Sequence, residues 1–267
     1  MAKQKGPVTH SGKLGDVVYT DGKYGKNARK DAHLTEKQKK EKADLPQNRR
    51  TAILNGLASG LNTAVDYYGG ALRSGKFYSA IHSLFRKEKS NHRVLLLDML
   101  KNEEVHPKYT FNKLCPLPVT DLKISKTNYT VEVEMKDPAY KYGDVNCFYL
   151  QFILFVWNSE DNNCRHAAES TPWVDMKDKT AKYTTVKFKR TPKDTEYLLA
   201  CRCVLGVNQT PGYFTETGMR FLLPGSVTIE GKRLLEEKRA GIEAARAQVP
   251  EKKIVTEKPR LKWREKK

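Results

Sequence analysis

Two stretches of sequence decide the fold of this chain: FYLQFILFVW at residues 148–157 and TEYLLACRCVL at residues 195–205. The first is apolar at nearly every position, which is typical of a strand buried on both faces. In the second, apolar residues occupy every other position from Tyr197 to Leu205, which predicts one shared apolar face. Both stretches therefore predict central strands of an antiparallel β-structure.

Shorter stretches on either side show the same alternation. Turn residues separate them at short intervals, and no helix of crossover length intervenes. We therefore expect an antiparallel β-sandwich over residues 115–230. In the first flanking stretch, the apolar Val131, Val133 and Met135 alternate with Glu132 and Glu134. In the second, Val186 and Phe188 alternate with Lys187 and Lys189.

Residues 46–114 have helical periodicity instead. Their apolar side chains recur every three to four residues, which predicts a small helical layer. The expected helices contain Ile53, Leu57, Leu61, Val65 and Tyr68, ended by Gly69-Gly70; then Phe77, Ile81, Leu84 and Phe85; then Val94 to Leu100, capped by Ser90 or Asn91. The predicted fold class is thus α+β, with this layer followed by the sandwich.

The charge of the chain is concentrated at its ends. The chain has 49 Lys and Arg against 31 Asp and Glu, a net charge of +18. Residues 1–50 and residues 231–267 each contain 13 basic and 6 acidic side chains, whereas residues 116–230 contain 14 of each. A neutral module with two basic ends favours binding to polyanions or acidic surfaces over chemistry.

The N-terminal region, residues 1–45, is expected to be a basic arm containing a hairpin. Asp21-Gly22 follows an extended apolar run, and Asp-Gly is a strong signal for a two-residue turn, so we predict a hairpin over residues 16–28. Residues 26–50 contain few large apolar groups and are predicted to be an arm or linker. Residues 231–267 are predicted to form a basic helix, stopped by Pro250, and a tail.

The β-rich half resembles fibronectin type III domains. The residues that carry the resemblance are Pro192, Asp194, Thr195, Glu196 and Tyr197, followed by alternating apolar positions to Val207-Asn208. In that family a tyrosine at this point donates its hydroxyl to the backbone, and the resemblance implies this role for Tyr197. Trp157 and Trp173 do not stand where the family has its usual tryptophan, so the resemblance extends to the sandwich class over about 110 residues.

The start of the chain resembles a group of uncharacterised Bacteroidota proteins that are often encoded near phage or mobile elements. The shared features are Lys3-Gln4-Lys5-Gly6, Gly12-Lys13-Leu14-Gly15-Asp16 and the Asp21-Gly22 pair, with helices before a β-rich half. The resemblance implies no established activity.

Candidate catalytic and metal-binding groups have simpler structural interpretations. Cys164-Arg165-His166 could form a reactive thiolate, but the preceding residues favour an exposed loop. Cys201 and Cys203 alternate onto one apolar face and are expected to be core cysteines. The remaining groups are a solvated Glu132 and Glu134 pair, a half-buried His82 whose ring is hydrogen-bonded, and turn glycines near the N-terminus. We expect no catalytic site, no metal and no cofactor.

The interaction residues are expected in the basic arms. An aromatic residue among lysines suggests a contact with a base or a protein groove. The residues assigned to this role are Val17, Tyr19, Lys37, Lys39, Lys40, Arg49, Arg50, Leu261, Lys262, Trp263 and Arg264. A solubilising role for lysine-rich ends is the simpler alternative.

These observations predict a non-enzymatic structural or assembly protein, with a phage particle or mobile element as its expected setting, that docks through its basic arms on neighbouring subunits or on a nucleic-acid-containing assembly. A nonspecific nucleic-acid-binding accessory protein is the alternative, and an enzyme with Cys164 as its nucleophile carries the least weight. No secretory signal or membrane span is recognised, and the odd cysteine count suggests reduced thiols, so a cytoplasmic location without membrane contact is expected.

Overall fold

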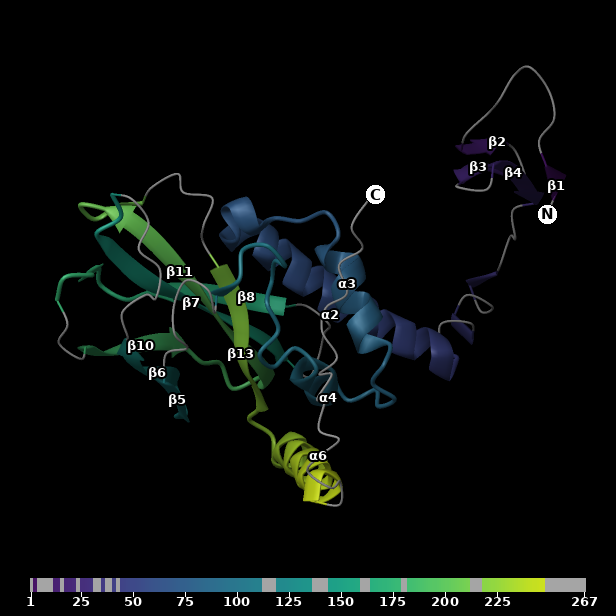
Figure 1. Ribbon diagram of the computed structural model, residues 1–267. Coiled ribbons are helices and arrows are strands. Elements are labelled where there is room, and N and C mark those ends of the chain that lie inside the picture. Colours follow the sequence, from purple (N-terminus) through teal and green to yellow (C-terminus); the bar gives the residue numbers. More distant parts are fainter. Residues whose placement is uncertain are drawn as a thin grey trace. The chain divides into compact units, whose positions relative to one another are not determined.

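The computed structural model divides the chain into two compact units, residues 1–49 and residues 50–267 (Figure 1). The residues that the structure describes are 2–3, 12–14, 17–22, 25–30, 35–36, 40–41, 44–111, 119–135, 144–158, 164–178, 182–211 and 218–247. Both units contain antiparallel strands, and the second also contains packed helices. The predicted α+β class with antiparallel sheets is confirmed.

The N-terminal unit contains a four-stranded antiparallel sheet in the order β1-β4-β3-β2. Its strands are β1 (Ala2–Lys3), β2 (Gly12–Leu14), β3 (Val17–Gly22) and β4 (Gly25–Lys30). The predicted hairpin is present as β3 and β4, but Asp21 and Gly22 are strand residues, paired with Lys26 and Gly25. The predicted turn position was wrong, because glycine accepts extended backbone as readily as a turn conformation.

The sheet also extends beyond the predicted hairpin. Gly12, Gly22 and Gly25 are strand residues and not turn glycines. Residues 26–30, predicted to belong to an arm, form most of β4, which pairs with β3 on one side and β1 on the other. The few apolar residues of β4 do not predict a strand from the sequence. Backbone pairing with neighbours on both sides stabilises the strand instead.

The helical layer of the second unit is formed by α2, α3 and α4 and is followed at the end of the unit by α6. Their bounds are α2 (Pro46–Tyr68), α3 (Phe77–Phe85), α4 (Arg93–Asp98) and α6 (Ile229–Ala247), with a short 3-10 helix η1 (Gly70–Leu72) after α2. The three predicted helices are confirmed, and Phe77, Ile81, Leu84 and Phe85 are all buried. The predicted cap of α4 was wrong: His92 occupies the N-cap position without a side-chain capping hydrogen bond, while Ser90 accepts a hydrogen bond from the His92 backbone.

Two further antiparallel sheets make up the rest of the unit. The larger contains β7 (Cys147–Asn158), β8 (Cys164–Ser170), β9 (Val174–Asp175), β11 (Asp194–Val207), β12 (Thr210–Pro211) and β13 (Gly218–Ser226). The smaller contains β5 (Val119–Ile124), β6 (Asn128–Met135) and β10 (Lys182–Lys189), with β6 in its centre. In the larger sheet β11 lies between β7 and β13, so both stretches that decide the fold are central strands.

Alternate residues of β7 and β11 pack into two different cores. Phe155 and Leu198 pack with the helices, whereas Phe152 and Cys201 pack with β6 and β10 of the smaller sheet. Each fully buried large apolar side chain stabilises the fold by about 1.5–3 kcal/mol relative to exposure. The larger sheet is therefore the middle of three layers, which explains why its sequence is apolar on both faces.

The N-terminal end of β11 is fastened by a buried carboxylate. Asp194 is 4% exposed and accepts hydrogen bonds from the Tyr129 hydroxyl at 3.2 Å and from the Arg165 guanidinium at 2.9 Å. Burial, followed by the charge of Asp194, raises the pKa of Tyr129. Tyr197 stacks obliquely on Tyr129, and within the described residues its hydroxyl makes no hydrogen bond to the backbone. The hydroxyl that hydrogen-bonds at this end of β11 is therefore that of Tyr129, and not that of Tyr197 as the resemblance implied.

Within the described ranges, the helices are too short or too polar to cross a bilayer.

Candidate docking surfaces

The register of the N-terminal sheet sorts its residues onto two faces. Directly paired residues share a face and successive residues of a strand alternate. One face, which we call the tyrosine face, takes the positions Ala2, Gly12, Leu14, Val17, Tyr19, Asp21, Lys26, Ala28 and Lys30. The other, which we call the basic face, takes Lys3, Lys13, Val18, Thr20, Gly22, Gly25, Asn27 and Arg29.

Two predicted interaction residues are thus brought together. Val17 pairs with Leu14 of β2, and Tyr19 pairs with Ala28 of β4. Both positions belong to the tyrosine face, two residues apart along β3. Leu14 and Ala28 were not predicted for this role, because only the register between strands places them beside Val17 and Tyr19.

The predicted basic residues from Lys37 to Arg49, which precede α2 or lie in its first turn, differ in what they contact. Lys40 is exposed, and Arg49 is exposed with its guanidinium 3.0 Å from the Asp44 carboxylate. Lys37 and Lys39 lie outside the described residues. Exposed pairs of this kind contribute little to stability, so Arg49 and Lys40 are accessible to a partner at small cost.

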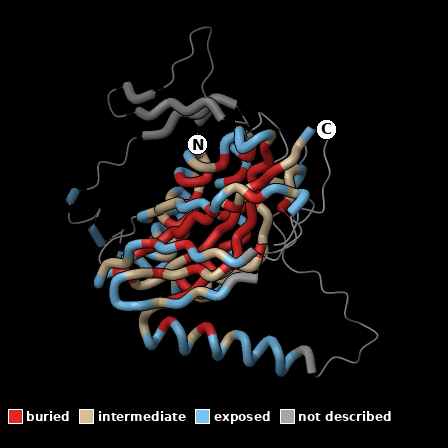
Figure 2. Tube along the Cα trace, turned by 90° about the vertical axis from the view of Figure 1, so that its left-hand side faces the viewer, coloured by how far each residue is buried: buried red, intermediate tan, exposed pale blue. Residues whose placement is uncertain are grey.

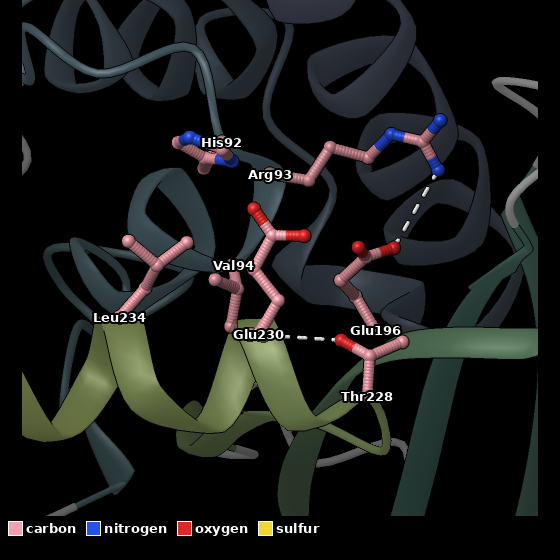
Figure 3. A pocket seen from close by; sticks show the side chains of 8 residues that line it. His92, Arg93, Val94, Glu196, Thr228, Glu230 and Leu234 are labelled. Atoms are coloured by element: carbon pink, nitrogen blue, oxygen red, sulfur yellow. Dashed lines mark hydrogen bonds and ion pairs between the residues drawn. The ribbon is translucent and has the colours of Figure 1, made fainter.

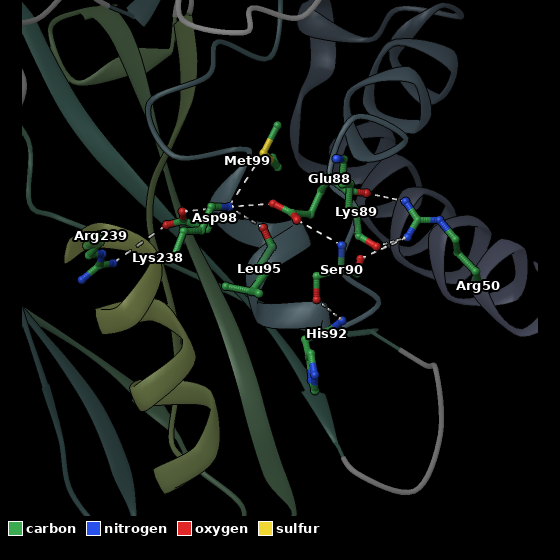
Figure 4. A network of polar contacts seen from close by, with 10 residues as sticks. All are labelled: Arg50, Glu88, Lys89, Ser90, His92, Leu95, Asp98, Met99, Lys238 and Arg239. Carbon is green, nitrogen blue, oxygen red and sulfur yellow. Dashed lines mark hydrogen bonds and ion pairs between the residues drawn. The ribbon is translucent and has the colours of Figure 1, made fainter. Parts of the chain in front are cut away.

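Arg50 is held inside the fold. Its guanidinium donates to the carbonyl oxygens of Glu88, Lys89 and Ser90 and to the Asn91 side chain, the last at 2.8 Å (Figure 4). One side chain on α2 therefore donates hydrogen bonds to the carbonyl oxygens of the loop that leads from α3 into α4. The sequence does not separate this structural arginine from the neighbouring Arg49.

The first half of α6 docks on α4 through a shared cation (Figure 4). The Lys238 ammonium lies 3.0 Å from Glu88 Oε2 and 3.4 Å from Asp98 Oδ2, and it also donates to the Leu95 carbonyl oxygen. Burial raises the pKa of Glu88, but hydrogen bonds from the Ser90 backbone and Lys238 outweigh it, so the pKa is lowered overall. The carboxylate is thus kept charged for Lys238.

The second half of α6 has a different environment. Leu235 is buried, but every side chain from Arg239 to Ala245 is exposed, including the apolar Ile242 (Figure 2). This exposed half leads toward the predicted C-terminal interaction residues. Those residues, Leu261, Lys262, Trp263 and Arg264, lie outside the described residues.

A small polar pocket lies beside the start of α6 (Figure 3). Its volume is about 60 Å³, and its walls include Arg93, Glu196 and Glu230. Arg93 is already engaged, because its guanidinium lies 3.6 Å from the Glu196 carboxylate and donates to the Asn158 carbonyl oxygen at 2.7 Å. The pocket is far below the roughly 300–1,000 Å³ of typical small-molecule sites.

A second pocket lies at the hairpin between β11 and β12. It measures about 180 Å³ and is lined by Asn146, Cys147, Trp173, Asp175, Asn208 and Gln209. Asn146 and Asn208 bond to each other at 2.8 Å, which uses the polar groups that would orient a ligand. This pocket too is smaller than typical ligand sites.

Cys164 does not lie in an exposed loop as predicted. Cys164, Arg165 and His166 are the first residues of β8, and the thiol packs against Gly60 of α2. Burial raises the pKa of the Cys164 thiol to about 12, so the thiol is protonated at neutral pH. His166 bonds to the Tyr68 hydroxyl, with 3.3 Å between Nδ1 and the oxygen. The exposed-loop prediction was wrong, because these residues pair with β7 as a strand and the Cys164 side chain packs on α2.

The other candidate catalytic and metal-binding residues lie in the core or make contacts with neighbouring side chains. Cys201 and Cys203 are buried in the core between the sheets, as predicted. Glu132 is half-buried and pairs with Lys123 at 2.7 Å. His82 was predicted to be hydrogen-bonded, but its ring stacks on Tyr78 and its Nε2 is buried without a partner among the described residues. No three acidic, His or Cys side chains in the described part are placed to hold a metal ion.

Comparison of this chain with protein-family models, with curated proteins and with solved structures finds no match.

Proposed function

We propose that this protein is a non-enzymatic structural or assembly protein that associates with neighbouring copies of itself through its N-terminal sheet and C-terminal tail. The register of the sheet is the observation that supports the proposal, because it gathers Leu14, Val17, Tyr19 and Ala28 on one face. The resemblance of the first residues to proteins encoded near mobile elements suggests a phage particle or a related assembly as the setting.

The size of the N-terminal unit favours an intermolecular role for this face. Small sheets with one apolar face need a cover to be stable, and a unit of this length buries little surface by itself. A second copy suits the tyrosine face, because Asp21 is directly paired with Lys26 there and Lys30 has a position on the same face, paired with Val17. Two such faces can bring opposite charges together, whereas two basic faces would repel each other.

We further propose that the two sheets of the second unit are a variant of the fibronectin type III sandwich. The shared core between β7, β11 and the smaller sheet supports this interpretation. In such a protein the sandwich and helical layer serve as a scaffold that holds the two ends.

The test compares two adjacent substitutions in β3 of the full chain. Tyr19→Gln alters the tyrosine face, and Thr20→Gln places the same side chain on the basic face. Sedimentation velocity over a protein concentration series should show self-association weakened about tenfold or more by Tyr19→Gln and little changed by Thr20→Gln. Equal effects of the two variants, or a wild-type chain that stays monomeric throughout, would overturn the proposal.

The C-terminal tail gives a second test. If the tail docks on protein, Trp263→Ala should weaken assembly more than neutralising Lys252 and Lys253 does, because apolar anchors dominate such contacts. The same sedimentation assay over a salt series measures both variants. A steep salt dependence governed by the lysines would support the alternative function, a nonspecific nucleic-acid-binding accessory protein.

A further inference from the structure

The basic face of the N-terminal sheet has a charge pattern unlike that of the tyrosine face. Lys13 of β2 and Arg29 of β4 are both register partners of Val18, one on each side of β3. Lys3 of β1 pairs with Asn27, two positions from Arg29 along β4. Three cationic positions from three strands therefore share one face of this small sheet.

Among the described strand residues, no acidic position shares this face. The face-sharing residues of the described strands are otherwise small or uncharged, and two of them, Thr20 and Asn27, are side chains that hydrogen-bond to phosphate oxygens in protein–DNA complexes. The tyrosine face, by contrast, includes Asp21 directly paired with Lys26. One face thus carries charge of a single sign, and the other carries both signs.

The spacing of the cationic positions suits a polyanion with regular charges. Neighbouring strands lie about 4.8 Å apart, so Lys13 and Arg29 stand roughly 10 Å apart across β3. Duplex DNA has one negative charge per about 1.7 Å of helix axis, so a patch of this width meets several phosphates. A protein partner fits less well, because the basic face has no aromatic position to act as an anchor.

We propose that the basic face binds the phosphate backbone of nucleic acid while the tyrosine face meets protein. The inference extends the proposed assembly role, since it assigns a second partner to the same sheet. Recognition is by charge and hydrogen bonding to phosphates, so binding is independent of nucleotide sequence.

The experiment uses two pairs of substitutions in the full chain that remove equal charge from opposite faces. Lys13→Gln with Arg29→Gln alters the basic face, and Lys26→Gln with Lys30→Gln alters the tyrosine face. Binding to a labelled short duplex is measured by fluorescence anisotropy from about 50 to about 200 mM salt. The basic-face pair should lose about tenfold or more in affinity and lower the slope of log K against log salt by about 1.8, and the other pair should change both much less.

Two further arms make each outcome decisive. Lys13→Arg with Arg29→Lys keeps the charge and should retain binding, so loss in this variant too would overturn the phosphate assignment. Polyglutamate of similar charge replaces the duplex in the second arm, and tighter binding to polyglutamate would assign the face to acidic protein. Equal losses in the two neutralised pairs, or none in either, would also overturn the inference. Self-association, read from Tyr19→Gln, fails or succeeds separately from these measurements.

Discussion

The hydroxyl of Tyr129, in the smaller sheet, donates a hydrogen bond of 3.2 Å to the buried carboxylate of Asp194, at the start of β11 in the larger sheet. The same carboxylate accepts from Arg165 of β8 and from the Thr191 backbone, each at 2.9 Å. A single buried carboxylate thus joins three strands of two sheets.

Substitutions at this contact should differ in their cost. Tyr129→Phe removes one hydrogen bond and should lower the free energy of unfolding by about 1 kcal/mol, whereas Asp194→Ala removes the acceptor shared by Tyr129, Arg165 and Thr191 and should cost about 3 kcal/mol. Urea denaturation of each variant measures the difference. A smaller loss for Asp194→Ala than for Tyr129→Phe would contradict the role of the carboxylate as the shared acceptor.

Glu88 should make stability depend on pH in one direction. Its pKa is lowered in the folded protein from the ordinary value of 4.5, so its contribution is present above about pH 4.5 and is lost as the pH falls through the lowered folded pKa. Glu88→Gln should therefore destabilise the protein at neutral pH, and this effect should shrink in acid.

Urea denaturation over a pH series compares the wild type with Glu88→Gln. Lys238→Met should give a similar loss, of about 1–2 kcal/mol at neutral pH, because it removes the cation from the same contact. Arg233→Met is the control, since Arg233 forms an exposed pair with Glu237 and should change stability little. A pH-independent effect of Glu88→Gln would show that its charge is not what matters.

The thiol of Cys164 should react slowly in the native protein. With its pKa raised to about 12, the thiolate is scarce at neutral pH, and packing against Gly60 limits access. Iodoacetamide labelling followed by mass spectrometry should show alkylation of Cys164 far slower in the folded chain than in urea. Rapid labelling of the folded chain would restore the hypothesis of a nucleophilic cysteine.

Removal of residues 1–45 and 250–267 should leave a folded, monomeric protein. The truncated chain keeps α6 and its contact between Lys238 and Glu88, together with both apolar cores. A matched truncation that ends at residue 228 should melt at a lower temperature, because it loses that contact and the buried Leu235. Calorimetry and sedimentation measure both chains, and loss of cooperative melting in the first would place the ends within the fold.

The sequence predicted the elements whose apolar pattern is long and regular. The helix stripe ending at Tyr68 and the strands around Phe152 and Cys201 were confirmed because burial on defined faces leaves a period of 3.6 or 2 in the chain. The strand at Cys164 was missed, since its burial comes from pairing with β7 and packing on α2, which are distant in sequence.

At the candidate surfaces too, some residues could be predicted from the local sequence, whereas others depend on contacts between segments that are distant in the sequence. The extended apolar run before Asp21 suggested Val17 and Tyr19, but the companions Leu14 and Ala28 follow only from the register between strands. Likewise, composition does not separate Arg49, which is exposed, from Arg50, which satisfies three carbonyl oxygens. Identical side chains acquire different roles from the direction in which the helix points them.

The first half of α6 packs on α4 and its second half is exposed, so the helix determines the distance and the direction at which the residues after it begin. Beyond the Lys238 anchor the helix continues to Ala247, and at 1.5 Å per residue this rod carries the chain about 13 Å from the point of attachment. Each residue added to the rod would advance its tip by about 1.5 Å and rotate it by about 100°. The length of α6 therefore acts as a spacer that determines both how far away and on which side the C-terminal tail begins.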